Sequence, residues 1–269
     1  MLGVNLVFLV AAPAFAADSS PWDGNQRAAV RLIAGAQRAD AGATVHRAGI
    51  EIRLAPGWKT YWRYPGDSGI PPRFDFSGSQ NVDRVALRWP APQRLTDESG
   101  TSIGYKHDVV FPLDVVPQDA TKPVMLALKI DYAVCEKICV PADGSAELTF
   151  TGKRSEHDDK LTRSATLVPK SAAVGADGPI SVRAARREGS RILVDLAAPP
   201  ATPVELFAEG PTPDWALPVP SPIAGAPAGQ QRFTFELDGL PPGIKPDGAT
   251  LKLTAVAGEQ AIEVPYRLD

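Results

Sequence analysis

The fold is decided by the stretch Lys129-Ile130-Asp131-Tyr132-Ala133-Val134-Cys135-Glu136-Lys137-Ile138-Cys139-Val140-Pro141, which holds the only two cysteines of the chain. Upstream of the cysteines, apolar residues alternate with polar or small ones, and one face collects Leu126, Leu128, Ile130, Tyr132 and Val134. A period of two predicts a half-buried strand. If the alternation continues, Cys135 points with Lys129 and Asp131 away from the core.

A second alternation follows, with Ala146, Leu148 and Phe150 pointing inward. Two such runs joined by a turn predict a hairpin with the cysteines near its tip. The Cα atoms of a disulfide lie roughly 4.4–6.8 Å apart, whereas four steps along one strand span about 13 Å. Across a loop of three residues the cysteines would be about 4.5–5.5 Å apart. They can therefore bond if the chain folds back here; a helical turn would also serve, but the alternation favours the hairpin.

Such a disulfide would stabilise the fold only weakly. Closing a loop of five residues is worth roughly 2 kcal/mol, against roughly 4.7 kcal/mol for a long loop. A chain of this length buries a large core without that help. A tight, exposed bridge is instead typical of redox work, so a redox pair is favoured over a structural disulfide. No histidine or basic cluster adjoins the pair in sequence, so activation of a thiol must come through space.

The pattern of Tyr132, Cys135 and Cys139-Val140-Pro141, between two apolar strands, resembles the periplasmic N-terminal domain of the DsbD and ScsB thiol:disulfide interchange family. Residues 54–63 are similar to the family's glycine-aromatic strand, and residues 96–105 resemble its cap-loop region. The resemblance covers about residues 45–150. It implies an immunoglobulin-like sandwich that needs no cofactor. It also implies that electrons pass from a separate membrane electron transporter to periplasmic thioredoxin-fold partners.

The resemblance also implies roles for single residues. Cys135 and Cys139 would be the catalytic pair, with Cys139 bonding to partners and Cys135 resolving the mixed disulfide. The expected surround of the site is Tyr61, Trp62, Asp97, Glu98, Ile103, Tyr105 and Tyr132. Residues 90–108, which are polar and lack a period, would form a flap over the hairpin; an ordinary surface connection is the alternative.

Residues 1–17 are interpreted as a secretory signal peptide. The apolar stretch that starts at Leu2 ends in Ala14-Phe15-Ala16, an A-x-A cleavage pattern. It is too short to span a bilayer as a helix, and no later stretch reaches 18 apolar residues. We therefore expect a periplasmic protein without a membrane span, in an oxidising compartment where paired cysteines normally form a disulfide.

The composition favours an all-β protein. The chain has 27 prolines, 23 glycines and many short alternating runs, which suit strands joined by turns. The net charge of −3 gives no footprint for nucleic acid. We expect a first sandwich over residues 18–151 with strands at 28–37, 50–54, 58–64, 74–76, 82–89 and 109–116; for residues 28–37 a helix is the alternative.

The rest of the chain predicts a second β-sandwich. Residues 152–178 are charged and poorly patterned, and we interpret them as a linker with one short helix. Residues 179–269 follow, with strand signals at 192–196, 204–207, 233–237, 251–256 and 262–266. This spacing fits a second immunoglobulin-like domain. It contains no cysteine and no histidine, so docking or support is its expected role.

Two other functions remain open. Two thiolates at this spacing can bind Cu(I), although soft sites of this kind usually add further ligands. The available histidines, His46, His107 and His157, are predicted to be surface residues and do not lie at ligand spacing from the cysteines. The third reading is a binding module whose hairpin disulfide is structural.

Overall fold

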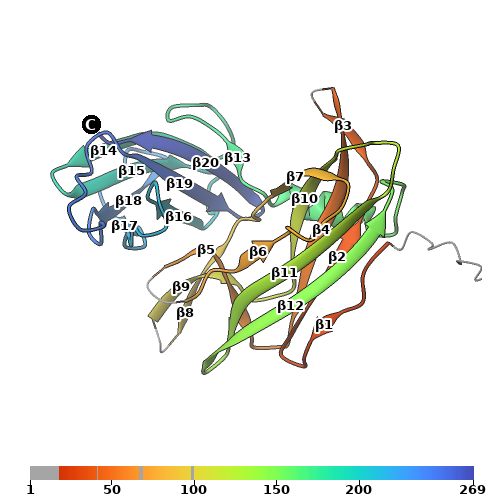
Figure 1. The fold of residues 1–269 in the computed structure, drawn as a ribbon. Helices are drawn as coiled ribbons and strands as arrows, with labels where there is room; N and C mark the ends of the chain where they lie inside the picture. The colour runs from red at the N-terminus through yellow and green to blue at the C-terminus, as the bar shows by residue number, and fades with distance from the viewer. Residues whose placement is uncertain (1–17, 41, 67–68, 98–99) are drawn as a thin grey trace, which may run out of the picture.

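The computed structural model describes residues 18–40, 42–66, 69–97 and 100–269; the predicted signal peptide lies outside the described residues. The described chain forms twenty strands and one α-helix, which confirms the all-β prediction. Figure 1 shows two units built from sheets, with the C-terminal strands, coloured cyan to blue, forming the second unit. In the described ranges, no helix is long and apolar enough to cross a membrane.

The first sandwich consists of β1–β12 and has two sheets. One sheet has the order β1-β2-β4-β10-β7, with β3 paired to β4, and the other has the order β12-β11-β5-β9-β8, with β6 paired to β11. The strands of the first sheet are β1 (Asp23–Gly24), β2 (Ala28–Ala34), β3 (Arg38–Asp40), β4 (Ala43–Leu54), β7 (Val82–Leu87) and β10 (Val109–Pro117). Those of the second are β5 (Lys59–Gly66), β6 (Arg73–Asp75), β8 (Gln93–Asp97), β9 (Gly100–Tyr105), β11 (Val124–Cys135) and β12 (Cys139–Phe150).

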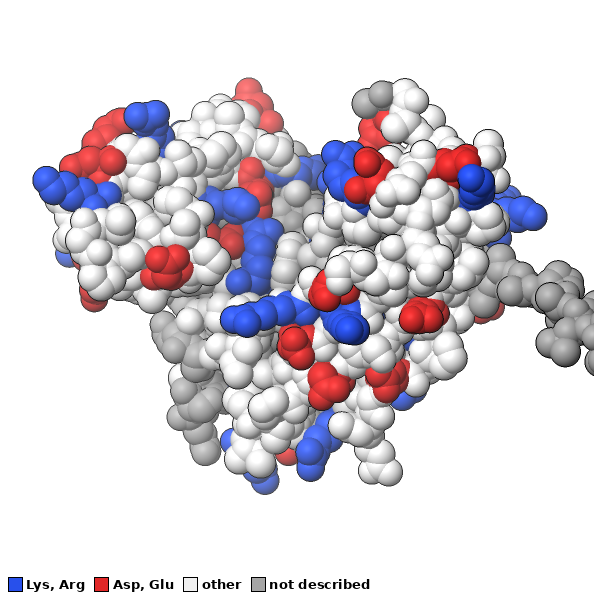
Figure 2. Space-filling model, viewed as in Figure 1, with Lys and Arg blue, Asp and Glu red and all other residues white. Residues whose placement is uncertain are grey.

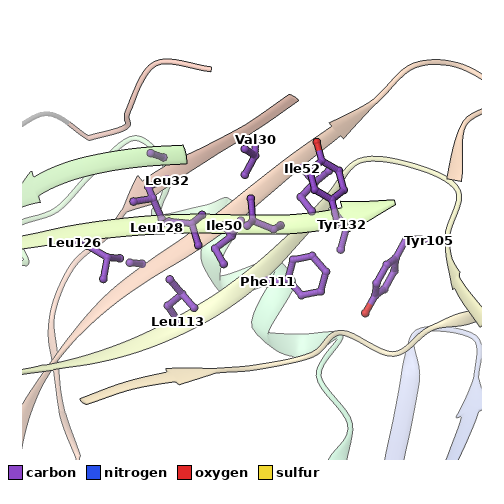
Figure 3. Close-up of a cluster of buried hydrophobic side chains, with 14 of the residues drawn as sticks. Val30, Leu32, Ile50, Ile52, Tyr105, Phe111, Leu113, Leu126, Leu128 and Tyr132 are labelled. Carbon is purple, nitrogen blue, oxygen red and sulfur yellow. The ribbon is translucent and has the colours of Figure 1, made fainter. Parts of the chain in front are cut away.

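The inward-facing residues of both sheets form one apolar core. Figure 3 shows side chains of β2, β4, β10 and β11 meeting between the sheets, among them Ile50, Phe111 and Leu128. Phe111 is fully buried and packs edge-on against Trp89 and Tyr105, with ring centroids 5.2 and 5.5 Å apart. Burial of this apolar surface is the main stabilising term of the sandwich.

The predicted hairpin is confirmed. Strands β11 and β12 pair over their full lengths, from Val124 opposite Phe150 to Cys135 opposite Cys139. Apolar residues of both strands alternate inward as expected, with Leu126 and Leu148 directly opposite one another. The three residues between the cysteines form the turn.

The expected flap is instead mainly a hairpin. Most of residues 90–108 lies in β8 and β9, which pair with each other, and β9 also pairs with β5. Ile103 belongs to the core of the first sandwich, and Leu95 and Ser102, which lie opposite each other on the other face of the hairpin, are buried as well. The alternation is short and is interrupted by glycine and threonine. Sequence pattern alone therefore did not predict these two strands, of which β8 is the edge strand of the sheet.

The helix of the predicted linker packs on the first sandwich. Helix α1 (Asp158–Thr166) contacts β4 and β10, and its Leu161 is buried. A Cβ atom at Gly49 of β4 would come within 2.8 Å of the Leu161 side chain, so glycine allows this close approach. The Arg47 guanidinium also donates to the Asp158 carboxylate at 2.5 Å.

The second sandwich consists of β13–β20. Its sheets have the orders β13-β20-β19-β16 and β14-β15-β18-β17 around a separate apolar core. The strands are β13 (Lys170–Ser171), β14 (Ser181–Glu188), β15 (Arg191–Ala197), β16 (Val204–Glu209), β17 (Ser221–Ile223), β18 (Gln230–Glu236), β19 (Thr250–Ala257) and β20 (Gln260–Arg267). The five expected strands are present, and the charged β14 was not foreseen because its arginines mask the alternation.

Two histidines are buried, contrary to the expectation that they are surface residues. His46 is 1% exposed and His157 is 7% exposed, whereas His107 is exposed. The His46 ring packs on Phe150 with centroids 5.8 Å apart, and the chain at Gly152 covers it. Among the described residues, neither ring nitrogen of His46 has a hydrogen-bond partner. Burial therefore lowers the pKa of His46 below its ordinary value of 6.5.

This burial makes stability depend on pH. Unfolded chains bind a proton at His46 below about pH 6.5, while the folded protein keeps the ring neutral to lower pH. The stabilisation is therefore complete above pH 6.5 and is lost as the pH falls toward the lowered pKa of the folded state. We expect the free energy of unfolding, measured with urea at about pH 7.5 and about pH 5.5, to fall in acid. His46→Leu should reduce this fall and the exposed control His107→Gln should not; equal pH dependence in both variants would contradict the assignment.

Candidate functional site

The site lies where β11 ends and β12 begins. Cys135 is the last residue of β11 and Cys139 the first of β12, and a disulfide joins them with the Cα atoms 4.1 Å apart. The disulfide that the hairpin geometry allows is therefore present in the structure. Strand β5 lies beside β11 here, with Thr60 opposite Val134 and Lys59 opposite Cys135.

The two sulfurs are in unequal environments. Cys135 is 1% exposed, whereas Cys139 is exposed. By parity Cys135 lies on the same face as Lys129 and Asp131, away from the main core, as predicted, but it is not exposed there. At this end of β11 a side chain of β5 covers the outer face, and Cys135 packs with Tyr61 and Ala133 in a small cluster of its own.

Tyr61 is the residue that covers the disulfide. Its hydroxyl oxygen lies 2.7 Å from Cys135 Sγ and 3.1 Å from Cys139 Sγ. A disulfide sulfur carries no proton, so the tyrosine hydroxyl is the donor. The chain at Gly69 also comes so close that a Cβ atom there would lie 2.4 Å from the ring. With a φ of +133°, Gly69 also adopts a conformation that side chains rarely permit. The disulfide and the backbone at Gly69 therefore both restrict the position of the ring.

A buried cation adjoins the cysteine pair through space. Lys59 is 6% exposed and its Nζ donates to Ser102 Oγ at 3.1 Å. Ser102 is itself buried and donates to the Leu95 carbonyl at 3.3 Å. Opposite residues of an antiparallel pair have Cβ atoms about 4.5–5.5 Å apart, so the Lys59 side chain starts beside that of Cys135. Sequence reasoning missed Lys59, because its pairing with Cys135 joins segments far apart in the chain.

Four other residues of the expected surround pack in the main core and not in the cluster of Tyr61, Ala133 and Cys135. Trp62, Ile103, Tyr105 and Tyr132 belong to the core of the first sandwich. Trp62 points into the core because neighbouring side chains in a strand face opposite ways and Tyr61 takes the outer face. Burial raises the pKa of Tyr132 to about 12, so its hydroxyl stays protonated. Asp97 ends β8, with nothing described of its side chain, and Glu98 lies outside the described residues.

The turn beside Cys139 is open to solvent. Glu136, Lys137 and Ile138 are all exposed, and Ile138 exposes 70% of its surface. Over the described ranges there is no group of three or more histidine, cysteine, aspartate or glutamate residues that could hold a metal ion. The site therefore offers one accessible sulfur, one sheltered sulfur and an apolar side chain beside the accessible one.

Comparison with known proteins gives two matches. Residues 29–151 match the family model described as "Thiol:disulfide interchange protein DsbD, N-terminal". The fold resembles the crystal structure of the N-terminal periplasmic domain of ScsB from Proteus mirabilis, with a TM-score of 0.72 and 20% sequence identity. That match covers 93% of this chain and 98% of the other, and so includes both sandwiches. Among curated proteins nothing matches.

If the Tyr61 ring shields the disulfide, its removal should speed reduction by a small thiol. We expect Tyr61→Leu, which keeps apolar bulk but loses the ring, to be reduced by dithiothreitol about tenfold faster than the unaltered protein, a change of about 1.4 kcal/mol in the barrier. Tyr61→Phe keeps the ring and loses the hydroxyl that contacts both sulfurs, so its rate should change by about 2–10-fold. Stopped-flow measurement of thiol release gives both rates. Equal rates in all three proteins would show that the ring is not a shield.

Proposed function

Because residues 29–151 belong to the family of DsbD N-terminal domains, we propose that this chain is a periplasmic dithiol–disulfide exchange protein. In this role it relays reducing equivalents from a separate membrane electron transporter to periplasmic thioredoxin-fold partners. The periplasmic location is supported by the fold shared with a domain described as periplasmic and by the signal-like residues 1–17.

The observation that carries the proposal is the inequality of the two sulfurs. Exchange needs one thiol that a partner protein can reach and a second that resolves the mixed disulfide. Cys139 is exposed at the hairpin turn, and Cys135 is buried under Tyr61 within bonding distance of it. This arrangement supports Cys139 as the residue that bonds to partners and Cys135 as the resolving residue.

The chemistry balances as two successive displacements. In the reduced protein the Cys139 thiolate attacks a partner disulfide, so that a mixed disulfide forms and one partner sulfur leaves as a thiolate. The Cys135 thiolate then attacks Cys139 Sγ, which forms the Cys135–Cys139 bond and releases the second partner sulfur. The partner gains two electrons and two protons. A dithiol of the membrane transporter restores the reduced pair by the reverse sequence.

The surroundings of the pair suit this cycle. A thiolate formed in the reduced protein would be favoured by a nearby positive charge and by a hydroxyl donor. Lys59 lies opposite Cys135 in the sheet and the Tyr61 hydroxyl already contacts both sulfurs. The exposed Ile138 beside Cys139 supplies apolar surface for a partner. No metal or organic cofactor enters any step.

Single cysteine variants test the order of attack. Reduced Cys135→Ser keeps the accessible thiol and loses the resolving one, so it should accumulate a mixed disulfide with an oxidised thioredoxin-fold protein. Cys139→Ser keeps only the sheltered thiol and should form at least about tenfold less adduct, because a thiol reacts only where it is accessible. Non-reducing electrophoresis and mass spectrometry quantify the adducts. More adduct in Cys139→Ser would reverse the assignment, and none in either variant would contradict exchange.

The reduction potential of the pair separates exchange from a structural role. Equilibration with glutathione should give about −200 to −250 mV, in the range of proteins that exchange with one another. A value below about −300 mV is typical of a structural disulfide and would contradict the proposed function.

A further inference from the structure

Strand β5 leaves its own sheet immediately after Tyr61. Tyr61 pairs with Gly104 of β9, and the following pair joins Gly66 to Ser102. Four residues of β5 are therefore opposite only one residue of β9. On the other side, β5 pairs with β11 only at Lys59 and Thr60. Residues 62–65 thus form a bulge that the ladder of the sheet does not hold. Bulges of this kind re-aim side chains and occur beside active sites.

The second sandwich binds the bulge through charged groups. The Arg63 guanidinium donates to both carboxylate oxygens of Glu209, at 2.8 and 2.7 Å, and also to the carboxylate of Glu263. These side chains expose only 20%, 13% and 28% of their surface, so solvent screens them weakly. Figure 2 shows acidic and basic atoms meeting in the hollow between the two units.

An aromatic contact lies under the charged one. Phe207 of β16 is fully buried and belongs to the core of the first sandwich, where its ring centroid is 5.9 Å from that of Trp62. Tyr64, two residues after Trp62 in the bulge, donates from its hydroxyl to the Leu217 carbonyl. Three successive residues of β5 are therefore each held by the second sandwich.

The same strand β16 also reaches the hairpin that supports Lys59. The Arg94 backbone N–H of β8 points to the Glu205 carboxylate at 3.3 Å, and the Arg94 guanidinium donates to the Pro220 carbonyl at 2.6 Å. Strand β8 pairs with β9, which carries Ser102. Strand β5 and the β8–β9 hairpin, which together carry Lys59, Tyr61 and Ser102, are thus both in contact with the second sandwich, the hairpin through Arg94 of β8.

We propose that the second sandwich is a positioning element of the redox site. Its contacts with residues 62–65 hold Tyr61 on the disulfide and thereby set the rate at which the disulfide is reduced. Arg63, Glu209, Glu263 and Phe207 are positioning residues in this scheme, because none touches a sulfur. The inference rests on the proposed function for its biological meaning. Its physical content, the reactivity of the bond, can be measured without a partner.

The test compares two sets of charge changes in the second sandwich of the full chain. Glu209→Gln with Glu263→Gln removes both carboxylates from Arg63. Asp195→Asn is the control, because it disrupts a buried ion cluster with Arg232 and Arg186 in the other sheet, away from β5. We expect the double variant to be reduced by dithiothreitol about fivefold faster or more, and the control to stay within about twofold, since about 1 kcal/mol corresponds to a factor of five.

A combination with Tyr61→Leu shows whether the effect passes through Tyr61. If these contacts act by placing the ring, the double charge variant should change the rate by less than about twofold in the Tyr61→Leu background, a coupling that double-mutant cycles detect. The same acceleration in both backgrounds, or none in either, would overturn the inference. Phe207→Leu carries the same expectation and replaces the charge variant if circular dichroism shows that the latter does not fold.

The outcomes separate this inference from the proposed function. If reduction by dithiothreitol is faster and depends on Tyr61, but the reduced protein forms no adduct with an oxidised thioredoxin-fold protein, exchange is refuted and the positioning role is kept. If the protein exchanges disulfides normally and dithiothreitol reduces the charge variants no faster than the unaltered protein, the positioning role is refuted and the proposed function is kept.

Discussion

The site depends on two residue pairs between β5 and β11, Thr60 with Val134 and Lys59 with Cys135. These pairs set the register at which the aromatic strand meets the cysteine hairpin. Because side chains alternate across a strand, a slip by one residue would turn Trp62 to the outer face and Tyr61 into the core. The contacts of the Tyr61 hydroxyl with both sulfurs follow from that register. The fold thus specifies which aromatic residue meets the disulfide, through backbone pairing rather than through any attraction between ring and sulfur.

The hairpin itself explains why a disulfide can form there and still be accessible on one side only. Antiparallel pairing brings the cysteines opposite each other, so the bond closes a loop too small to stabilise the chain much. Strand β11, which carries Cys135, lies inside the sheet between β12 and β5, whereas β12 is the edge strand. Cys139 lies on that edge and Cys135 lies between two strands. Inequality of the sulfurs is therefore a consequence of where each strand sits in the sheet.

Local pattern predicted the hairpin and most of the long strands, but it missed β8, β9 and β14 and was insufficient for the site. The alternation from Leu126 to Val134 and from Ala146 to Phe150 predicted the hairpin, since each face of a strand is read from its own residues. Tyr61 was foreseen only as one of seven surround residues, because its face depends on the register with β11. Lys59 was missed for the same reason. The bulge at residues 62–65 has no local signal, because it forms where a second sandwich, distant in sequence, replaces the missing ladder.

The chemistry of the contact between the sandwiches fits a role in orientation more than in affinity. Burial lowers the pKa of Arg63, but the hydrogen bonds and charges of Glu209 and Glu263 outweigh it and raise the pKa, so the guanidinium stays charged. Burying three charges costs desolvation energy that the ion pairs only about repay, and apolar residues would bind the sandwiches at least as tightly. A planar guanidinium gripped by two oxygens of one carboxylate, however, permits only a narrow range of angles. Phe207 contributes buried apolar contact, and Arg63 fixes the orientation of β5. The Tyr61 ring can stay on the disulfide only if β5 keeps that orientation.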